Sequence, residues 1–436
     1  MMRISFRVGL TALIFLFTLC GAAQNHFARR VVDTLASPYM AGRGYLDNGC
    51  SKAAKYIGDR FRQFGLIPFG SGYRQPFVLP VNTYPKQMDV EITEGLPGSR
   101  LIPAKNGIDY IVIPSTPAIK GKFPIFRFDV ALLQDTTHLR QFLKQDFSRS
   151  FILVDDSGAK AGKEKELFET LRFNPIKAKG IIMLCDKLTE ETSDTVMNFA
   201  LLYALRNSIF NKATTVYLNI KNKFIKDYKD QNLIGYIKGK TQPDTFLVFS
   251  AHYDHLGRMD GIYFPGANDN ASGTAMLLAL ARYFTKPENQ PYYSIAFMAF
   301  AAEEVGMRGS HYYIQHPLFP LSKIKFLINM DIMGTGDDGI TVVNGSVYKA
   351  AFNDLVRLND SLHLLKQVKM RGATANSDHY FFYAAGVPDF FIYTMGGIRA
   401  YHDIYDRRET LPLTKFSEVF ELLVHFTDDI CRRTYN

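Results

Sequence analysis

The sequence has 436 residues, of which 47% are hydrophobic and 21% are charged. It therefore describes an ordered globular protein that is long enough for two domains, and it excludes a disordered chain. The formal net charge is +9, but the lysines and arginines are dispersed among acids and form no run of five or more basic residues. The charge pattern thus gives no indication of nucleic-acid binding.

The amino terminus, MMRISFRVGLTALIFLFTLCGAAQN, has the pattern of a secretory signal peptide. Two arginines precede an apolar run over residues 8–19, and small residues stand three and one positions before Gln24. The run is too short for a comfortable membrane span. We therefore expect residues 1–23 to be a signal peptide and the mature protein to be periplasmic or secreted. Cys20 would permit a lipoprotein, but Leu19 directly before it is a poor residue for that signal.

Cysteine usage restricts the kinds of metal site that the sequence could form. After cleavage three cysteines remain, Cys50, Cys185 and Cys431, which are too few and too dispersed for a disulfide framework. The sequence has no CxxC motif and no Cys/His cluster. Any metal would therefore be held by nitrogen and oxygen. No later stretch is apolar and long enough to span a bilayer, so no stable membrane span is expected.

The first half of the chain changes character near residue 83. Residues 26–65 carry apolar residues at three- and four-residue spacing, which predicts two helices, the second ending near Gly65. Residues 83–228 contain short β-type runs such as MDVEI, DYIVI, FPIFRF, FILVDD, KGIIML and TVYLNI. Helices are predicted between these runs around residues 137–145, 164–171 and 195–209. No histidines or acids cluster at the predicted strand ends, so we expect a β-rich insertion without catalytic groups.

From about Asn232 onward, apolar strands alternate with helices. TFLVFSAH, SIAFMAF, KFLINMD and DFFIYTMG read as strands, and ASGTAMLLALARYF reads as a helix. This alternation predicts an α/β fold with a mostly parallel sheet flanked by helices. We expect residues 24–82 to pack on the same sheet as residues 229–436, with residues 83–228 as an inserted β-rich domain.

Possible metal ligands follow nearly every predicted strand of this sheet. Side chains after the carboxyl ends of parallel strands meet at one edge of the sheet, where ligands of α/β proteins bind. One further acid lies in the loop GANDNASG just before a helix, and one histidine follows DFFIYTMGG. The candidate residues are His252, Asp269, Glu303, Glu304, Asp331 and His402.

Two imidazoles and three carboxylates suit two zinc ions, with Asp269 as a bridge between them. Two divalent cations balance three carboxylates and one hydroxide, so a neutral cluster can sit in a partly buried cleft. Glu304 is one of these three carboxylate ligands, so the neighbouring Glu303 is not needed to bind metal. A general base must reach the metal-bound water without being a ligand itself, and we expect Glu303 to have that role.

The short segment HYDH surrounds the first predicted ligand. His252 and Asp254 share one side of a strand, so Asp254 can accept a proton from the second ring nitrogen of His252 and fix its orientation. His255 has no such spacing argument, and we expect a surface or loop role for it.

These residues carry a resemblance to a known family. The chain resembles the family M28 zinc aminopeptidases over residues 231–430, and more weakly over residues 26–80 through AGR (41–43). The insertion, through FILVDD and AKGIIMLCD, resembles a protease-associated domain. One segment, YHDIYD, departs from many relatives and leaves the role of Asp403 open. The motifs that match are HYD (252–254), GANDNASG (266–273), AAEEVGMRGS (301–310), NMD (329–331), SDH (377–379) and YHD (401–403).

The resemblance implies roles for the same residues. His252 and Asp331 would hold one zinc, Glu304 and His402 the other, and Asp269 would bridge them. Glu303 would be the base and Tyr401 would help to stabilise the oxyanion.

The predicted function is that of a secreted di-zinc metallo-exopeptidase that removes amino-terminal residues from peptides through a metal-bound hydroxide. Three alternatives share the fold. They are a glutaminyl cyclase-like acyltransferase with one zinc, a carboxypeptidase, and a peptide-binding protein without activity.

Overall fold

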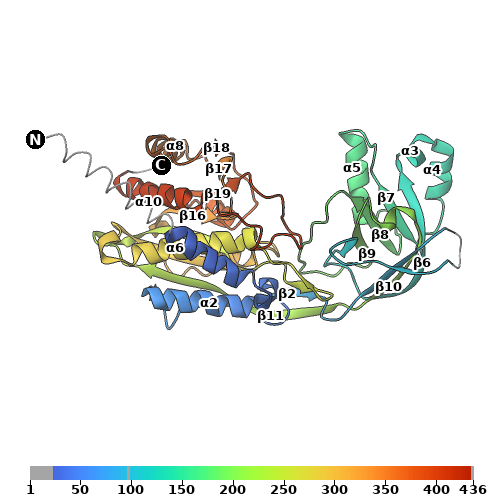
Figure 1. Cartoon of the computed structure of the whole chain (residues 1–436), viewed down its shortest axis with the longest axis horizontal. Coiled ribbons are helices and arrows are strands. Elements are labelled where there is room, and N and C mark those ends of the chain that lie inside the picture. The colour runs from blue at the N-terminus through green and yellow to red at the C-terminus, as the bar shows by residue number, and fades with distance from the viewer. Residues whose placement is uncertain (1–22, 96–98, 434–436) are drawn as a thin grey trace, which may run out of the picture.

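A computed structural model describes residues 23–95 and 99–433, and shows two bodies side by side along the longest axis of the molecule (Figure 1). The expected signal peptide, apart from residue 23, and Cys20 lie outside the described residues. Within the described ranges, no helix has the length and the apolar character needed to cross a membrane.

The larger body is built on a nine-stranded sheet. The spatial order is β1-β11-β15-β12-β16-β19-β17-β18, and β2 also pairs with β11. Its four central strands run parallel to one another; they are β15 (Tyr293–Phe300), β12 (Gln242–His252), β16 (Ile324–Met330) and β19 (Asp389–Met395). Antiparallel pairs join this centre to β11 and to β17. The outer strands are β1 (Ile67–Pro68), β2 (Arg74–Thr83), β11 (Lys223–Ile237), β17 (Gly339–Val343) and β18 (Val368–Met370).

Helices cover both faces of this sheet, which confirms the predicted α/β architecture. One face packs against residues 23–35, α2 (Gly49–Phe64), α6 (Gly273–Phe284), α8 (Lys349–Leu362) and α10 (Phe416–Arg432). The other face packs against α7 (Arg308–Gln315) and α9 (His379–Ala384). The residues of β12 alternate between these cores, with Leu247 and Phe249 on the first and Phe246 and Val248 on the second. A strand buried on both faces is apolar throughout, which explains its continuous hydrophobic run.

The smaller body contains an eight-stranded sheet in the order β4-β3-β10-β6-β7-β8-β9-β5. Its strands are β3 (Asp89–Glu94), β4 (Ile102–Pro103), β5 (Tyr110–Val112), β6 (Ile119–Asp129), β7 (Phe151–Asp155), β8 (Gly180–Cys185), β9 (Ala200–Leu205) and β10 (Ala213–Ile220). Its helices are α3 (Val130–Gln134), α4 (Thr136–Leu143) and α5 (Lys163–Thr170). Two separate apolar clusters fill this body, so it has a core of its own.

Two predictions about this body are wrong. Part of the helix predicted over 195–209 is the strand β9, which pairs with β8 and β5. Its sequence, ALLYAL, is rich in helix formers, but pairing and burial in the sheet override that local preference. Acids also cluster at strand ends, contrary to expectation. Asp129 and Asp155 end neighbouring strands, and Asp155 lies in ion pairs with Arg127 and Arg206.

A long antiparallel ribbon connects the two bodies. β2 and β11 pair from Thr83 with Lys223 to Arg74 with Leu233. β2 runs from the larger sheet towards the smaller body, and β11 returns from there into the larger sheet (Figure 1). The expected boundaries at residues 83 and 228 therefore fall on this ribbon. A small hairpin of β13 (Arg258–Met259) and β14 (Ile262–Tyr263) lies outside both sheets.

Candidate metal centre

The parallel strands bring the predicted ligands to one edge of the larger sheet. His252 is the last residue of β12, and Asp331 directly follows β16. Glu304 comes four residues after the end of β15, beyond a turn in which Ala302 has a positive φ of 57°. Asp269 lies in the turn that leads into α6.

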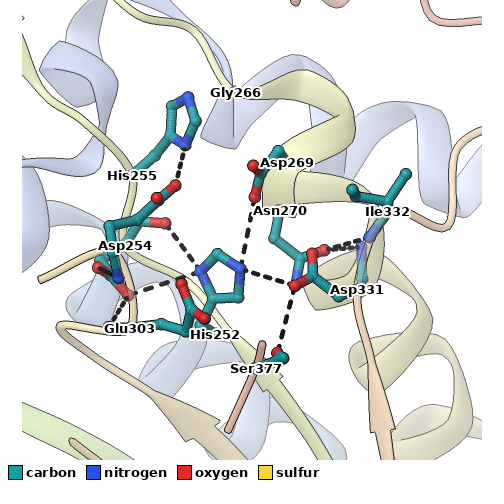
Figure 2. A network of polar contacts seen from close by, with 12 residues as sticks. His252, Asp254, His255, Gly266, Asp269, Asn270, Glu303, Asp331, Ile332 and Ser377 are labelled. Carbon is teal, nitrogen blue, oxygen red and sulfur yellow. Dashed lines mark hydrogen bonds and ion pairs between the residues drawn. The ribbon is translucent and has the colours of Figure 1, made fainter. Parts of the chain in front are cut away.

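His252, Asp269 and Asp331 form a first trio (Figure 2). The Nε2 atom of His252 lies 3.4 Å from Oδ1 of Asp269 and 3.3 Å from Oδ2 of Asp331. The second oxygen of Asp331, Oδ1, is buried and has no hydrogen-bond partner within the described chain. Three nitrogen and oxygen donors converge here, one of them otherwise unsatisfied, and this donor set fits a zinc ion.

His402, Asp269 and Glu304 form a second trio beside the first. The Nε2 atom of His402 lies 2.9 Å from Oδ2 of Asp269 and 3.1 Å from Oε2 of Glu304. The two oxygens of Asp269 thus face different imidazoles, His252 through Oδ1 and His402 through Oδ2. A carboxylate placed in this way is suited to bridge two cations.

The electrostatic environment also favours cations. Burial alone would lower the pKa of His402, but Glu304 and Asp269 raise it to about 12. Burial would likewise lower the pKa of His252, yet the carboxylates of Asp331 and Glu303 raise it well above its ordinary value. Both imidazoles therefore report a strongly negative potential, which bound metal ions would neutralise.

His255 lies in the loop after β12, as one part of the expectation had it, but it is buried beside this site, so the expected surface role is wrong. Its side chain is fully buried, and Nδ1 lies 2.6 Å from Oε1 of Glu304. The other ring nitrogen, Nε2, is buried without a partner in the part of the chain that the structure describes. His255, Asp269 and Glu304 also converge closely enough to hold a metal ion. The alternation of side chains along β12 could not predict this, because His255 lies beyond the end of the strand. The loop conformation sets the direction of its side chain.

Asp254 holds the turn that carries the two glutamates. Its Oδ1 accepts a hydrogen bond from the backbone N–H of Glu303 at 3.1 Å, and its Oδ2 accepts one from Glu304 at 3.3 Å. Oδ1 also lies 3.6 Å from Nδ1 of His252, and the backbone oxygen of Asp254 lies 3.3 Å from the same atom (Figure 2). One carboxylate therefore links the end of β12 to the segment after β15.

Glu303 lies beside His252 and takes no part in either trio (Figure 2). Burial raises its pKa well above the ordinary value, and Glu304 adds to this effect while His252 opposes it. A carboxylate with a raised pKa accepts a proton more readily than an exposed one.

Tyr401 is 43% exposed, and its ring stacks on His402 with the centroids 4.0 Å apart. Burial of the phenol and the nearby carboxylates raise its pKa.

Arg43, from the AGR segment, connects the loop after β12 with the loop that leads to Asp269. Its fully buried guanidinium donates hydrogen bonds to five backbone carbonyls, those of Leu35, Tyr253, Pro265, Gly266 and Asp269. The neighbouring Gly42 has a φ of 65°, and a Cβ there would lie 2.2 Å from the carbonyl oxygen of Gly257. The segment therefore needs glycine for a close backbone approach.

Asp406 also holds the loop that contains Asp269. It accepts hydrogen bonds from the backbone N–H groups of Asn268 and Asp269 at 2.8 and 2.9 Å. Sequence reasoning missed this residue, although the repeated aspartates of YHDIYD were a signal.

Comparison with known proteins agrees with this arrangement. Residues 232–427 match the profile of peptidase family M28. Residues 232–427 of the chain therefore belong to this family. Aminopeptidase YwaD of Bacillus subtilis (strain 168) is 37% identical over 119 residues, which make up 27% of this chain and 24% of that protein. The matched segment thus spans about a quarter of the length of this curated relative.

Two solved structures share the fold. BSAP, a zinc aminopeptidase from Bacillus subtilis, matches with a TM-score of 0.68 and 18% identity over 93% of this chain and 94% of that one. A peptidase M28 precursor from Shewanella amazonensis SB2B matches with a TM-score of 0.70 and 16% identity, over 96% and 99% of the two chains. Coverage this high means that the shared M28 fold includes most of the smaller body.

Proposed function

We propose that this M28 protein is a di-zinc metallo-exopeptidase that removes amino-terminal residues from peptides. The observation that carries the proposal is the placement of Asp269, whose two oxygens face the imidazoles of His252 and His402. His252 and Asp331 would hold one zinc, and His402 and Glu304 the other. Relatives named as aminopeptidases support the direction of cleavage.

When bound, the two zinc ions supply Lewis acidity, which polarises the scissile carbonyl and makes a water molecule more acidic. The residues of the chain then supply positioning and proton transfer. Glu303 takes a proton from the attacking water and later gives it to the leaving amine. The carboxylate of Asp254 keeps Glu303 in place by accepting a hydrogen bond from the backbone N–H of Glu303. Tyr401 stands at the exposed side of His402, where it stabilises the developing oxyanion.

The decisive test is Glu303→Gln. The amide keeps the shape of the side chain but cannot accept the proton, so we expect both zinc ions and the fold to be retained and turnover to fall at least about a hundredfold. Glu288→Gln, an exposed glutamate outside both trios, is the matched control and should behave as wild type. Zinc content, melting temperature and kcat are measured for both. Near-normal turnover in Glu303→Gln would refute the mechanism.

Cleavage direction needs a separate experiment. Peptides with an acetylated amino terminus should resist cleavage, whereas peptides with an amidated carboxyl terminus should lose amino-terminal residues, as mass spectrometry would show. The reverse pattern would identify a carboxypeptidase. Loss of ammonia from peptides that begin with glutamine, without cleavage, would identify a cyclase.

Export of the protein is also part of the proposal. It rests on the signal-peptide pattern of residues 1–23. Amino-terminal sequencing of protein expressed with its native leader should begin at Gln24, and a chain that retains residue 1 in the cytoplasmic fraction would contradict export.

A further inference from the structure

The smaller body reaches the metal centre through one extended segment. Residues 187–194, here called the strap, lie between β8 and β9 and contain no helix or strand. Within the strap, Leu188 and Glu190 are buried, at 7% and 1% exposure. The strap contacts two of the three segments that carry the second trio, those of Glu304 and His402.

The first contact fixes the imidazole of His402. The Nδ1 atom of His402 lies 2.9 Å from the backbone oxygen of Glu190, and the N–H of Glu190 donates to the backbone oxygen of His402 at 2.8 Å. A carbonyl only accepts, so Nδ1 carries the hydrogen and the lone pair that binds metal is on Nε2. Nε2 is the atom that faces Asp269 and Glu304.

The same pair of hydrogen bonds also stabilises the backbone conformation of His402. His402 has a φ of +52°, a left-handed conformation that is unfavourable for a residue with a side chain. Such a conformation persists where surrounding contacts hold it. The two hydrogen bonds with Glu190 are contacts of that kind.

The second contact fixes the turn of Glu304. The hydroxyl of Thr192 donates to the backbone oxygen of Glu304 at 2.6 Å. Further along the strap, Asp194 forms an ion pair with Arg308 at the start of α7. The strap thus holds both ends of the segment that follows the glutamates.

The third contact is made by Lys187, which binds the loop around His402. The ammonium of Lys187 donates to the backbone oxygens of Arg399 and Tyr401, each at 3.0 Å. It also lies 3.2 Å from Oδ2 of Asp403, whose Oδ1 accepts a hydrogen bond from the N–H of Tyr405 at 2.9 Å. Asp403 therefore links the strap to the turn that presents His402.

We propose that the strap is a positioning element of the second metal site, so that tight binding of the second zinc depends on the docked smaller body. The inference rests on the proposed function in one respect, the presence of two zinc ions. Among the described residues, the hydrogen bonds and ion pairs of the strap reach the loops of Glu304 and His402 but not His252 or Asp331. The effect should therefore be confined to one of the two ions.

The test is the double variant Lys187→Met/Thr192→Val, which removes side-chain donors of the strap and leaves both trios intact. Zinc affinity is measured by titration of metal-free protein against a chromogenic chelator. We expect one of two binding steps to lose roughly 10–100-fold in affinity, as is typical when the partners of ligands are removed, and the other step to be unchanged. Thr192→Ser, which keeps the hydroxyl, should bind as wild type.

The matched control is Lys212→Met/Thr170→Val in the same body. Lys212 is exposed, and the hydroxyl of Thr170 donates to the backbone oxygen of Leu167 at 2.6 Å, far along the sequence from the strap. This variant should keep both affinities. Equal weakening of both steps in the strap variant, or no weakening of either, would overturn the inference.

A second measurement uses the reciprocity of linked equilibria. If docking of the strap strengthens zinc binding, zinc must strengthen docking by the same factor. Deuterium uptake at residues 187–194 should fall when zinc is added to metal-free protein, while uptake in α5 stays constant. Unchanged uptake in the strap would overturn the inference. Wild-type protein that binds a single zinc would contradict the proposed function itself, whereas two zinc ions without peptide cleavage would leave the inference standing and remove only the activity.

Discussion

His255 adds a third imidazole to the second trio. Its Nδ1 lies 2.6 Å from Glu304, on the carboxylate oxygen that His402 does not face. In the proposed two-zinc centre, the ring would therefore either orient Glu304 or bind the second zinc directly. In both cases its loss should affect one metal ion, because the first trio involves other atoms.

We predict that His255→Ala lowers the affinity for the second zinc by about 10–100-fold and leaves the first unchanged. His255→Gln, whose side chain can still reach a carboxylate, should restore part of the affinity if His255 orients Glu304. His138→Gln, on the exposed surface of α4, is the control. Metal titration distinguishes the outcomes, and wild-type affinity for both ions in His255→Ala would show that the residue has no part in the centre.

The predictability of individual residues follows from how each is placed. His252 and Asp331 could be found because they follow continuous apolar runs, and parallel strands must end at a common edge. The backbone oxygen of Glu190 could not be found, since a carbonyl has no sequence signature. The burial of Arg43 is similar, because its partners are backbone oxygens from distant segments.

At the scale of elements, the ends of strands in the smaller body carry a compact ion-pair cluster. Asp155, at the end of β7, accepts hydrogen bonds from Arg127, Arg206 and the N–H of Ser157. Burial by itself would raise the pKa of Asp155, but the bonds to Ser157 and the two arginines hold it below its ordinary value. A carboxyl group whose folded pKa is depressed stabilises the fold above its unfolded pKa, and that contribution is lost as pH falls through the folded pKa.

We predict that Asp155→Asn destabilises the smaller body by roughly 1–3 kcal/mol at neutral pH, because two arginines lose a charged partner. The stability difference from wild type should begin to shrink as the pH falls below about 4, the ordinary pKa of an aspartate in the unfolded chain, and should be lost below the depressed pKa of folded Asp155. Urea unfolding at several pH values measures both effects. Asp186→Asn is the control, since Asp186 is 89% exposed and pairs with the same Arg206. An equal loss in both variants would mean that burial of Asp155 is unimportant.

The predictability of elements depends on whether local preference and tertiary packing agree. Helices such as α2 and α6 carry their own apolar periodicity and were predicted correctly. β9 was not, because ALLYAL prefers a helix in isolation and becomes a strand only between β8 and β5. Strand pairing over long sequence separations is not visible in a local pattern.

At the scale of the whole molecule, the two bodies have separate apolar cores and are joined by the β2–β11 ribbon, the strap and the β13–β14 hairpin (Figure 1). In the hairpin, Met259 packs in an apolar cluster of the smaller body, and Asp260 accepts a hydrogen bond from the N–H of Met88. Both trios lie on residues of the larger body, so zinc binds to a site that exists only when that body is folded. A ligand that binds only the folded state stabilises it, by about 4 kcal/mol at a free concentration of a thousand times Kd.

We therefore predict that removal of zinc with a strong chelator lowers the melting temperature of the larger body by many degrees, and that added zinc restores it. In this proposal the smaller body holds no zinc ligand. Its melting temperature should therefore change only to the extent that zinc strengthens the contacts of the strap with the larger body. Scanning calorimetry with and without chelator would show one transition that depends strongly on zinc and one that depends on it weakly. In the variant Lys187→Met/Thr192→Val the weak dependence should shrink, because the side-chain contacts of Lys187 and Thr192 with the loops of His402 and Glu304 are then lost. A large and equal shift of both transitions in that variant would mean that contacts other than these two side chains couple the metal centre to the smaller body.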